Sequence, residues 1–319
     1  MTLLATLLPV SVVVPVRNEA GTLPELLAAL LRQSAKPAEV ILVDTGSTDN
    51  STAIAREWAK TAARAGIEFR VEELPGGYPG AARNAGVRSA THEWIAFIDA
   101  GIVPEDDWLS ALWTSNARVS KDALFGVCRF VSDSLLGRVL CALSYGYGRV
   151  QPVLPASLFR RVLFDKVGFF SPDLRSGEDI LWKRALAAAG VPMGTCQEAR
   201  VEYRHFPTTL PLAAHKWFSY ERSVTMAGIG GGLRAVALFG VLILYGLLFA
   251  APTVGATGLA AYLLLRGIAD PMRRSGWRPW WGSQTWAILA AVPVAAVLDV
   301  SAAAGRVAGL VGGCRHAGH

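Results

Sequence analysis

The chain has 319 residues, of which 52% are hydrophobic and 18% charged, so it is apolar and poor in charge for a soluble protein. Its formal net charge of +6 is modest and suits a protein seated against an anionic membrane face better than a nucleic-acid binder. The four cysteines have no CxxC spacing, which argues against a disulfide framework.

The first sixteen residues are apolar but do not have the pattern of a signal peptide. They lack a basic segment, and Pro9 and Pro15 interrupt the run. The β-branched residues 12–14 instead indicate a buried first strand. We therefore expect the soluble part of the chain to stay in the cytosol.

Short apolar runs alternate with helical patterns over the first half of the chain. The predicted strands, each followed by a helical pattern, are residues 11–16, 40–44, 67–74 and 94–100. This alternation predicts an α/β fold, Rossmann-like, with a mostly parallel sheet and helices on both of its faces.

Two of these runs deliver an acid at their carboxyl end, Asp44 and Asp99. Ligands of such sheets bind outside the carboxyl ends of the strands. Two acids on neighbouring strand ends therefore suggest a site. The alternative after Asp44 is a plain strand-to-helix turn, with Ser47, Thr48 and Asp49 as turn and capping residues.

Beyond residue 130 the alternation weakens, although a helix is predicted to begin near Glu178. Residues 205–228 have apolar side chains on one helical face and basic residues among the remainder. This pattern predicts either an amphipathic helix on a membrane surface or a core helix of the soluble domain.

The last third of the chain is predicted to be embedded in a membrane. Residues 235–265 form an uncharged run of 31, and residues 279–298 a second of 20. About 20 apolar residues span a bilayer as a helix. The first run predicts a helical hairpin with arms near 234–251 and 253–266, or else one long kinked helix. A third segment, about 284–310, either spans the membrane or dips into it.

Four segments occur in an order and at spacings that resemble a family 2 glycosyltransferase of the bacterial, membrane-associated type. They are VSVVVPVRNEAGTLPELLAALLRQ, EVILVDTGSTDNST, GYPGAARNAGVRSATHEWIAFIDAG and FFSPDLRSGEDILWKRALAAAG. The resemblance covers roughly residues 9–206 and implies the GT-A fold. We accordingly predict a GT-A domain over 1–206, an amphipathic interfacial segment over 207–230 and a membrane-embedded region over 231–319.

The resemblance implies that a nucleotide diphosphate sugar binds along the strand ends. The turn after the first strand would line the nucleoside with Pro15, Arg17, Asn18 and Glu19. Asp44 would accept a hydrogen bond from the base or ribose, and Arg83 would face the nucleotide. The bland alternatives are a solvated acid for Glu19 and a surface helix arginine for Arg83.

In the family a divalent cation, Mg²⁺ or Mn²⁺, binds an Asp-x-Asp motif. Here the matching segment is FIDAG, so Asp99 is present but Gly101 replaces the second acid. One carboxylate with substrate phosphates can still suffice for Mg²⁺. His205 matches a histidine ligand of some relatives, the alternative being a plain interface histidine. This departure puts metal dependence in doubt.

The resemblance makes Asp179 the general base, which would take a proton from the acceptor hydroxyl. An acid in the first turn of a helix, such as Glu178 or Asp179, also complements the helix dipole without any catalytic role. The Gln-x-x-Arg-Trp motif of processive synthases is not found, which disfavours long-chain polymerisation.

Together these features predict an inverting glycosyltransferase of cell-envelope glycan or glycolipid synthesis. It would be a multi-pass protein of the cell membrane with a cytosolic catalytic domain and a lipid-linked or apolar acceptor. One alternative is a polyprenyl-phosphate glycosyltransferase. Others are a catalytically silent nucleotide-binding membrane protein and a nucleotidyltransferase, whose Gly-rich basic loop after the first strand is missing here.

Overall fold

The computed structural model describes residues 7–229 and 233–316. The chain divides into two compact units, Met1–Arg129 with Val150–Tyr203, and Phe130–Arg149 with Arg204–His319. Each unit is continuous in space but assembled from two stretches of sequence.

The first unit contains eight strands and six helices of the described chain. In chain order they are β1 (Leu7–Val16), α1 (Leu23–Arg32), β2 (Lys36–Asp44), α2 (Ser51–Arg64), β3 (Glu68–Glu73), α3 (Pro79–Ser89), β4 (Trp94–Phe97), β5 (Ile102–Pro104), α4 (Trp108–Val119), β6 (Ala123–Phe130), β7 (Val150–Arg160), α6 (Val162–Val167), α7 (Glu178–Ala188) and β8 (Met193–Tyr203).

The strands form one sheet in the order β3-β2-β1-β4-β7-β6-β8-β5. Strands β3, β2, β1 and β4 are parallel, whereas β7 is antiparallel to both β4 and β6, and β5 is antiparallel to β8. The predicted α/β class is therefore confirmed, and the half of the sheet formed after β4 adds antiparallel strands.

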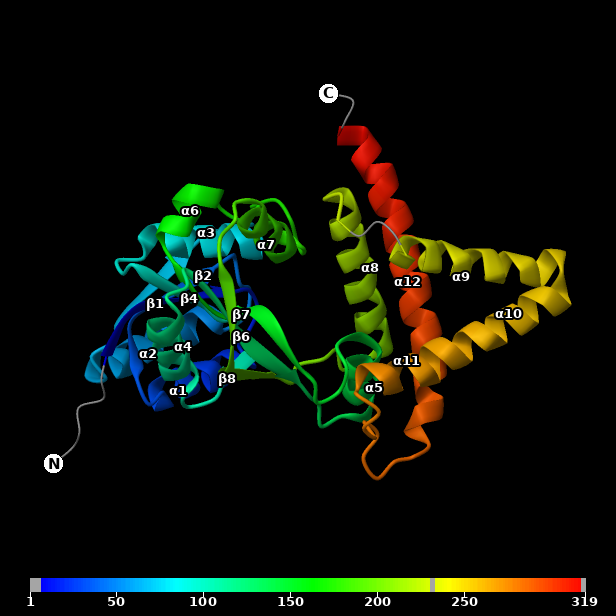
Figure 1. The fold of residues 1–319 in the computed structure, drawn as a ribbon, viewed down its shortest axis with the longest axis horizontal. Coiled ribbons are helices and arrows are strands. Elements are labelled where there is room, and N and C mark those ends of the chain that lie inside the picture. Colours follow the sequence, from blue (N-terminus) through cyan, green and yellow to red (C-terminus); the bar gives the residue numbers. More distant parts are fainter. Residues whose placement is uncertain (1–6, 230–232, 317–319) are drawn as a thin grey trace. The chain divides into compact units, whose positions relative to one another are not determined.

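Strands β1 and β2 have nearly continuous apolar runs because the sheet is covered on both faces. Residues 12–14 of β1 and 40–43 of β2 are fully buried. Helices α1, α2 and α4 lie on one side of the sheet, and α3, α6 and α7 on the other (Figure 1). Both strands begin about four residues earlier than predicted, at Leu7 and Lys36.

An aromatic cluster forms the core between the sheet and the helices α6 and α7. Its rings are those of Phe97, Phe159, Phe164, Phe170 and Trp182. Trp182 is 2% exposed, and its indole N–H donates to the carbonyl of Gly168 over 2.8 Å. This side chain packs in the core, so the core anchors the helix that begins at Glu178.

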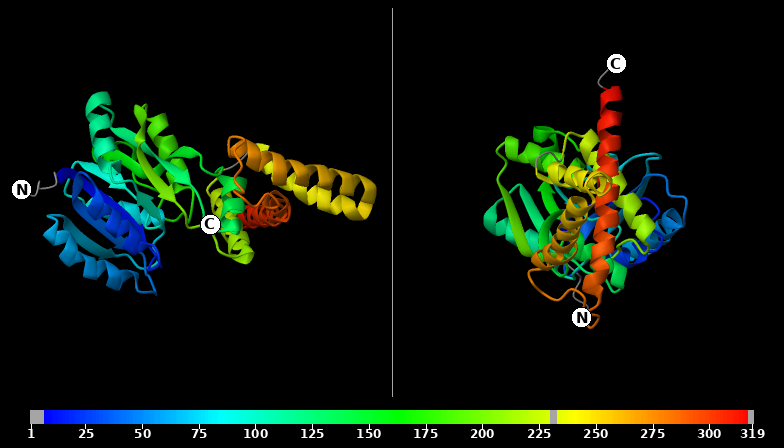
Figure 2. Two further views of the ribbon diagram at one scale, coloured as in Figure 1. Left: turned by 90° about the horizontal axis from the view of Figure 1, so that it is seen from below. Right: turned by 90° about the vertical axis from the view of Figure 1, so that its right-hand side faces the viewer.

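The second unit contains helices and a π-helical turn. They are α5 (Leu135–Ser144), α8 (Leu210–Met226), α9 (Leu233–Ala250), α10 (Pro252–Leu264), η1 (Leu265–Ala269), α11 (Asp270–Arg274) and α12 (Ala287–His316). Helices α9 and α10 form the predicted hairpin rather than one long kinked helix. They project together from α12 (Figures 1 and 2).

Helix α12 packs closely along α8. A Cβ on Gly305 would lie 2.2 Å from the carbonyl oxygen of Phe218, and one on Gly309 would lie 2.8 Å from that of Arg222. Arg306 donates to Glu221 of α8 over 3.3 Å, and both side chains are buried. Of the two interpretations of residues 205–228, the buried Glu221 and the contact with α12 favour a core position for this face of α8, within the second unit.

A polar network crosses the middle of α12. Asp299 accepts hydrogen bonds from Tyr262 and, over 2.8 Å, from Arg266. Arg266 also donates to Asp270, which in turn accepts from Arg274 over 2.6 Å. By length and composition, residues 287–312 of α12 are the one described segment that could cross a membrane, and 44% of the residues in its most apolar window are buried.

Candidate active site at the strand ends

The predicted acids lie at the carboxyl ends of the parallel strands, but not on neighbouring strands. Asp44 is the last residue of β2 and pairs in register with Val16 of β1. Asp99 follows the end of β4 by two residues. Because β1 lies between β2 and β4, two strand spacings separate these tips, roughly 10 Å. The expectation of neighbouring strand ends was wrong, because β4 pairs with β1 rather than with β2.

The loop after β1 and the loop after β2 are joined by hydrogen bonds. The side-chain oxygen of Asn18 accepts from the Thr48 backbone N–H over 2.7 Å, and the Asn18 N–H donates to Ser47 Oγ over 2.9 Å. The Glu19 N–H donates to Ser51 Oγ over 2.8 Å. Asn18 has a φ of +56°, a left-handed conformation that asparagine tolerates better than most residues. These bonds fix the two loops as one surface.

The carboxylate of Asp44 accepts hydrogen bonds from the loop after β2 and from the start of α2. One carboxylate oxygen accepts from the Ser47 N–H at 3.0 Å and the Ser47 hydroxyl at 2.6 Å, and the other from the Thr52 hydroxyl at 2.8 Å. The residue is only 4% exposed. Asp44 therefore shapes the turn, while its predicted contact with a base or ribose stays a prediction.

Arg83 lies at the centre of the site, in α3, and bridges two acids from distant parts of the chain. Its guanidinium donates to Asp99 over 2.8 Å and to Glu178 over 2.6 Å. Arg83 and Glu178 have side chains only 4% and 7% exposed, whereas Asp99 is 38% exposed. Arg83 is thus a buried bridge, and its interpretation as a surface helix arginine was wrong.

The electrostatics of this bridge follow from its burial. Burial disfavours the charged form of Arg83 and by itself would lower its pKa. The negative charges of Asp99 and Glu178 outweigh burial and hold the pKa of Arg83 above the ordinary arginine value. For Glu178 burial dominates, so the pKa of this carboxyl is raised, and the nearby charge of Asp179 adds to the effect while Arg83 opposes it. Arg83 Nε is buried without a hydrogen-bond partner within the described structure, which leaves a donor for which the neighbouring side chains supply no acceptor.

Asp179 lies beside this bridge in the first turn of α7. Gly177, with a φ of +93°, precedes the helix and turns the chain into it. Asp179 is half-buried and its carboxylate accepts from the Ile180 N–H over 2.8 Å. Its charge acts on both Arg83 and Glu178. The α7 start therefore supplies two acids with different surroundings, one buried and paired and one partly open.

The start of α3 fits closely against the segment that precedes α7. A Cβ on Gly80 would lie 2.4 Å from the carbonyl oxygen of Ser171 and 3.3 Å from the Glu178 side chain. Asn84, one turn further on, exchanges hydrogen bonds of 2.8 and 3.0 Å with the backbone of Phe170. Only glycine allows this approach, which brings Arg83 within reach of Glu178.

The position of the missing second acid faces another carboxylate. A Cβ on Gly101 would lie 4.0 Å from Glu19 Oε2 and 3.9 Å from the Tyr203 ring. Glu19 is half-buried and also accepts from the Thr22 hydroxyl over 2.5 Å. Glu19 thus brings a carboxylate near the position of the missing acid, and Asp99, two residues earlier in the chain, supplies another. Carboxylate oxygens fit a hard divalent cation held mainly by substrate phosphates.

Three other predicted site residues lie outside the hydrogen-bonded network described around Arg83. Pro15 is half-buried near the end of β1, and Arg17 is exposed in the following loop. His205 is exposed and belongs to the second unit, so its role as a metal ligand stays a prediction. Among the described residues no group of three or more His, Cys, Asp or Glu side chains is arranged to hold a metal ion.

Sequence reasoning missed the role of Glu178 as the partner of Arg83. The two residues are 95 positions apart, so no local spacing relates them. The available signal was the pair of acids at one helix start, which suggested either a dipole effect or a base and not a buried ion pair.

Residues 11–179 match the family described as Glycosyl transferase family 2. The chain belongs to this family. The matched segment begins in β1 and ends at Asp179, so it includes both strand-end loops, Arg83, Asp99 and the start of α7.

Two relatives illustrate the range of the family. The family 2 chain is 27% identical over 230 residues to an uncharacterized glycosyltransferase, EpsJ, of Bacillus subtilis, covering 65% of this chain and 64% of EpsJ. It is 28% identical over 172 residues to the dodecaprenyl-phosphate galacturonate synthase of Rhizobium johnstonii, covering 49% of this chain and 50% of that protein. The chain therefore spans less than two thirds of the length of each.

Among solved structures, the mannosyltransferase PcManGT from Pyrobaculum calidifontis, in complex with GDP-Man and Mn²⁺, resembles this chain. The TM-score is 0.55 at 22% identity, and the match covers 92% of this chain and 87% of PcManGT. At this identity the likeness shows the fold alone, and it confirms the GT-A fold expected from the sequence.

Proposed function

We propose that this protein is an inverting glycosyltransferase that moves a sugar from a nucleotide diphosphate donor to a lipid-linked or membrane-proximal acceptor. Family membership supports sugar transfer. The observation that carries the proposal is the Arg83 bridge, which ties Asp99 at a strand end to Glu178 beside Asp179. One buried guanidinium thereby holds the donor-side Asp99 and the residue next to the acceptor-side Asp179.

In this proposal the two hydrogen-bonded loops around Asn18 and Ser47 receive the nucleoside, and Asp44 maintains their shape. Asp99 and Glu19 lie near Gly101, where the diphosphate would lie. A divalent cation bound there would neutralise charge on the leaving diphosphate. PcManGT, which shares the fold, was solved with GDP-Man and Mn²⁺, and this supports cation use.

Asp179 is the proposed general base. It is partly open, whereas Glu178 is buried and committed to Arg83, so Asp179 is the better placed of the two acids to meet an acceptor. It accepts the proton of an acceptor hydroxyl as that oxygen attacks the anomeric carbon from the side opposite the departing diphosphate. One displacement of this kind inverts the anomeric centre.

The proposed acceptor is lipid-linked because the second unit is rich in apolar helices, including α12. We propose a cell-membrane location with a cytosolic catalytic domain over 1–206, an interfacial segment over 207–230 and a membrane region over 231–319. The multi-pass arrangement is one of two topologies available to the α9–α10 hairpin, the other being entry and return on one side.

A polyprenyl phosphate is a specific alternative acceptor, and the similarity to a dodecaprenyl-phosphate galacturonate synthase favours it. A phosphate acceptor is already anionic and needs no base. The two acceptor chemistries therefore differ in their dependence on Asp179.

The test is release of nucleotide by the purified full-length protein from a panel of nucleotide sugars, with membrane lipids added as acceptors. We expect release above background with at least one donor, lost in Asp99→Ala. Arg32→Met, which removes an exposed pair between the last residue of α1 and Asp106, is the matched control and should keep activity. A folded wild-type protein that binds nucleotide but releases none above background would instead support the silent-protein alternative.

A further inference from the structure

The α9–α10 hairpin exposes an apolar surface that is unusual for a protein in water. Phe249 is 91% exposed at the end of α9, and Ile243, Val254, Leu264 and Leu265 are each at least 57% exposed. Soluble proteins rarely expose contiguous apolar patches of this kind without an interaction to cover them. Residues 235–265, which include most of α9 and all of α10, contain no charged residue.

The lengths of the two helices limit how the hairpin can meet a bilayer. The helix that begins at Pro252 continues through η1 and α11 to Arg274, but only its residues 252–265 are uncharged. This uncharged part is about 21 Å long, short of a hydrocarbon core of about 30 Å. Helix α9 has 18 residues and is about 27 Å long. A hairpin whose second arm is apolar over this length alone reaches past the middle of the bilayer without delivering its tip to the opposite face, unless Arg266 is drawn into the hydrocarbon.

Both ends of the hairpin return to the same helices of the second unit. Helix α9 contacts α12, and α10 continues through η1 into α11, which contacts α5. Figure 1 shows the two helices meeting at a turn at the far end from α12 and diverging toward it. The tip, at Ala251, is therefore the part of the hairpin most remote from its polar root.

The root of the hairpin, residues 266–286 between α10 and α12, has the composition expected at a lipid headgroup layer. Arg273 pairs with Asp270 over 2.7 Å but keeps a side chain 65% exposed, and Trp277 and Trp286 are 68% and 57% exposed. Basic side chains attract anionic lipids, and tryptophan prefers the membrane interface. The charge at the root thus complements an anionic lipid surface, while the uncharged tip suits the hydrocarbon.

Hydropathy alone selects a different helix, α12, as the membrane span. Yet the middle of α12 carries Asp299, paired with Arg266, and its later part carries Arg306, paired with the buried Glu221. Residues at the middle of α12 are enclosed by η1 and α8. Ion pairs enclosed between helices are the features of an internal helix, so apolar composition does not require α12 to be the element that inserts.

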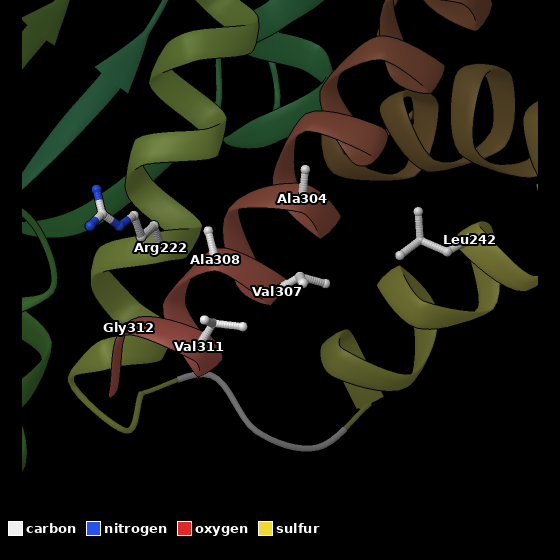
Figure 3. A pocket seen from close by; sticks show the side chains of 7 residues that line it. All are labelled: Arg222, Leu242, Ala304, Val307, Ala308, Val311 and Gly312. Carbon is white, nitrogen blue, oxygen red and sulfur yellow. The ribbon is translucent and has the colours of Figure 1, made fainter. Parts of the chain in front are cut away.

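The hollow beside α9 is lined by apolar residues except for Arg222 of α8. It has a volume of about 610 Å³ between α9 and α12, and Leu242 lies opposite Val307 and Val311 across it (Figure 3). A lipid chain lying against α9 would fill this hollow with hydrocarbon rather than water, so the apolar wall of α9 continues into the hollow.

We propose that the α9–α10 hairpin enters an anionic bilayer from one side as a wedge, with Phe249 and the neighbouring turn ending inside the hydrocarbon. The partner is thus the lipid bilayer itself. The inference rests on the membrane location proposed above, but not on sugar transfer. Under this inference the α9–α10 hairpin does not cross the membrane twice but enters and leaves it on the same side.

Accessibility of the tip tests the wedge. Phe249→Cys is made in full-length protein whose four native cysteines are alanine, labelled with the fluorophore NBD and reconstituted into vesicles of phosphatidylcholine and phosphatidylglycerol. We expect quenching by nitroxides on the lipid acyl chains and protection from dithionite, whether added outside or trapped inside. Bleaching from the face opposite the catalytic unit would mean that the hairpin crosses, and bleaching from the same face would mean that it stays in water; either result overturns the wedge.

A label at Val162→Cys is the matched control, because Val162 is 50% exposed and lies in α6 of the first unit. It should be bleached by dithionite on the side of the catalytic unit and should not be quenched by lipid nitroxides. The cysteine-free protein is first tested for flotation with the vesicles. If it does not float, the tip is labelled instead in a protein that keeps Cys128, Cys141 and Cys196, since these three are buried.

Flotation of the full-length protein with the same vesicles is a second, independent measurement. Phe249→Asp should lower the ratio of bound to free protein at least tenfold, and Val162→Asp should leave it unchanged. Wild-type protein that does not float would overturn the membrane location together with the wedge, whereas floating protein with an accessible tip would overturn the wedge alone. Nucleotide release enters neither measurement.

Discussion

Arg83 donates a hydrogen bond to Glu178 over 2.6 Å, and the two side chains are 4% and 7% exposed. The same guanidinium holds Asp99 over 2.8 Å. One buried cation therefore links the end of β4 to the beginning of α7. Removing either partner would leave a charge inside the protein, so the site and the stability of the first unit depend on each other.

Arg83→Met should destabilise the protein by about 3–5 kcal/mol, because it leaves the Glu178 carboxylate buried without its cation. The double variant with Glu178→Met should recover part of this loss, since it removes both charges. Urea unfolding of the single and double variants measures the coupling. Arg56→Met, which breaks an exposed pair with Glu73, should cost about 1 kcal/mol or less. Equal costs for the two arginine variants would contradict a buried bridge.

The raised pKa of Glu178 predicts how stability varies with pH. A carboxyl whose pKa is higher in the folded than in the unfolded protein stabilises the fold below the unfolded value of 4.5, and this contribution is lost as the pH rises through the folded value. Glu178→Gln removes the titration. The free energy of unfolding of the wild type minus that of Glu178→Gln should therefore fall as the pH is raised from about 4 to about 7. Urea unfolding at steps across this range measures it, and a difference that grows with pH would contradict the burial of Glu178.

Gly80→Ala should displace the start of α3 from the segment before α7, because the added Cβ would lie 2.4 Å from the Ser171 carbonyl oxygen. We expect a loss of about 1–3 kcal/mol, the usual cost of overpacking. Gly21→Ala is the matched control, since a Cβ there meets no atom within 4 Å. Thermal and urea unfolding of both variants measure the difference. Similar stability for the two would show that α3 can move away from Ser171 without cost, and would contradict the close packing at Gly80.

Asp179→Asn separates the two proposed acceptor chemistries. With a hydroxyl acceptor, loss of the general base should reduce turnover by about 10²–10⁴-fold, while the KM for the donor changes little. With a polyprenyl phosphate acceptor the same variant should keep most of its turnover. Steady-state rates with each acceptor decide between them. Unchanged turnover on a hydroxyl acceptor would remove Asp179 from the proposed mechanism.

Gly101→Asp restores the second acid of the family motif next to Glu19, whose Oε2 lies 4.0 Å from the new Cβ. An additional carboxylate should tighten Mn²⁺ binding roughly tenfold, since hard cations prefer carboxylate oxygens. Calorimetric titration of Mn²⁺ into the protein, without nucleotide sugar, measures the change. Gly101→Ala controls for the side chain alone. Weaker binding in Gly101→Asp would mean that repulsion from Glu19 outweighs the added ligand.

The order of the elements from β1 to β4 was readable from the sequence, because β1 and β2 have β-branched apolar runs and the helices between the strands have regular periodicity. The hairpin was predicted nearly to the residue, since Pro252 and the uncharged run around it mark its turn. The acids at the strand ends could also be named, because a polar residue directly after an apolar run can be recognised from the sequence alone.

Local sequence determined that β1 ends at Val16, that β2 ends at Asp44 and that α7 begins at Glu178, because turns and caps depend on neighbours a few positions away. Tertiary structure alone decided that β1 separates Asp44 from Asp99, and that Arg83 is a buried bridge to Glu178 rather than a surface arginine. It also decided that α12 carries its charges inside, toward Arg266 and Glu221. Each of these outcomes depends on contacts between residues far apart in the chain, where ion pairing and close packing, rather than periodicity, choose the partners.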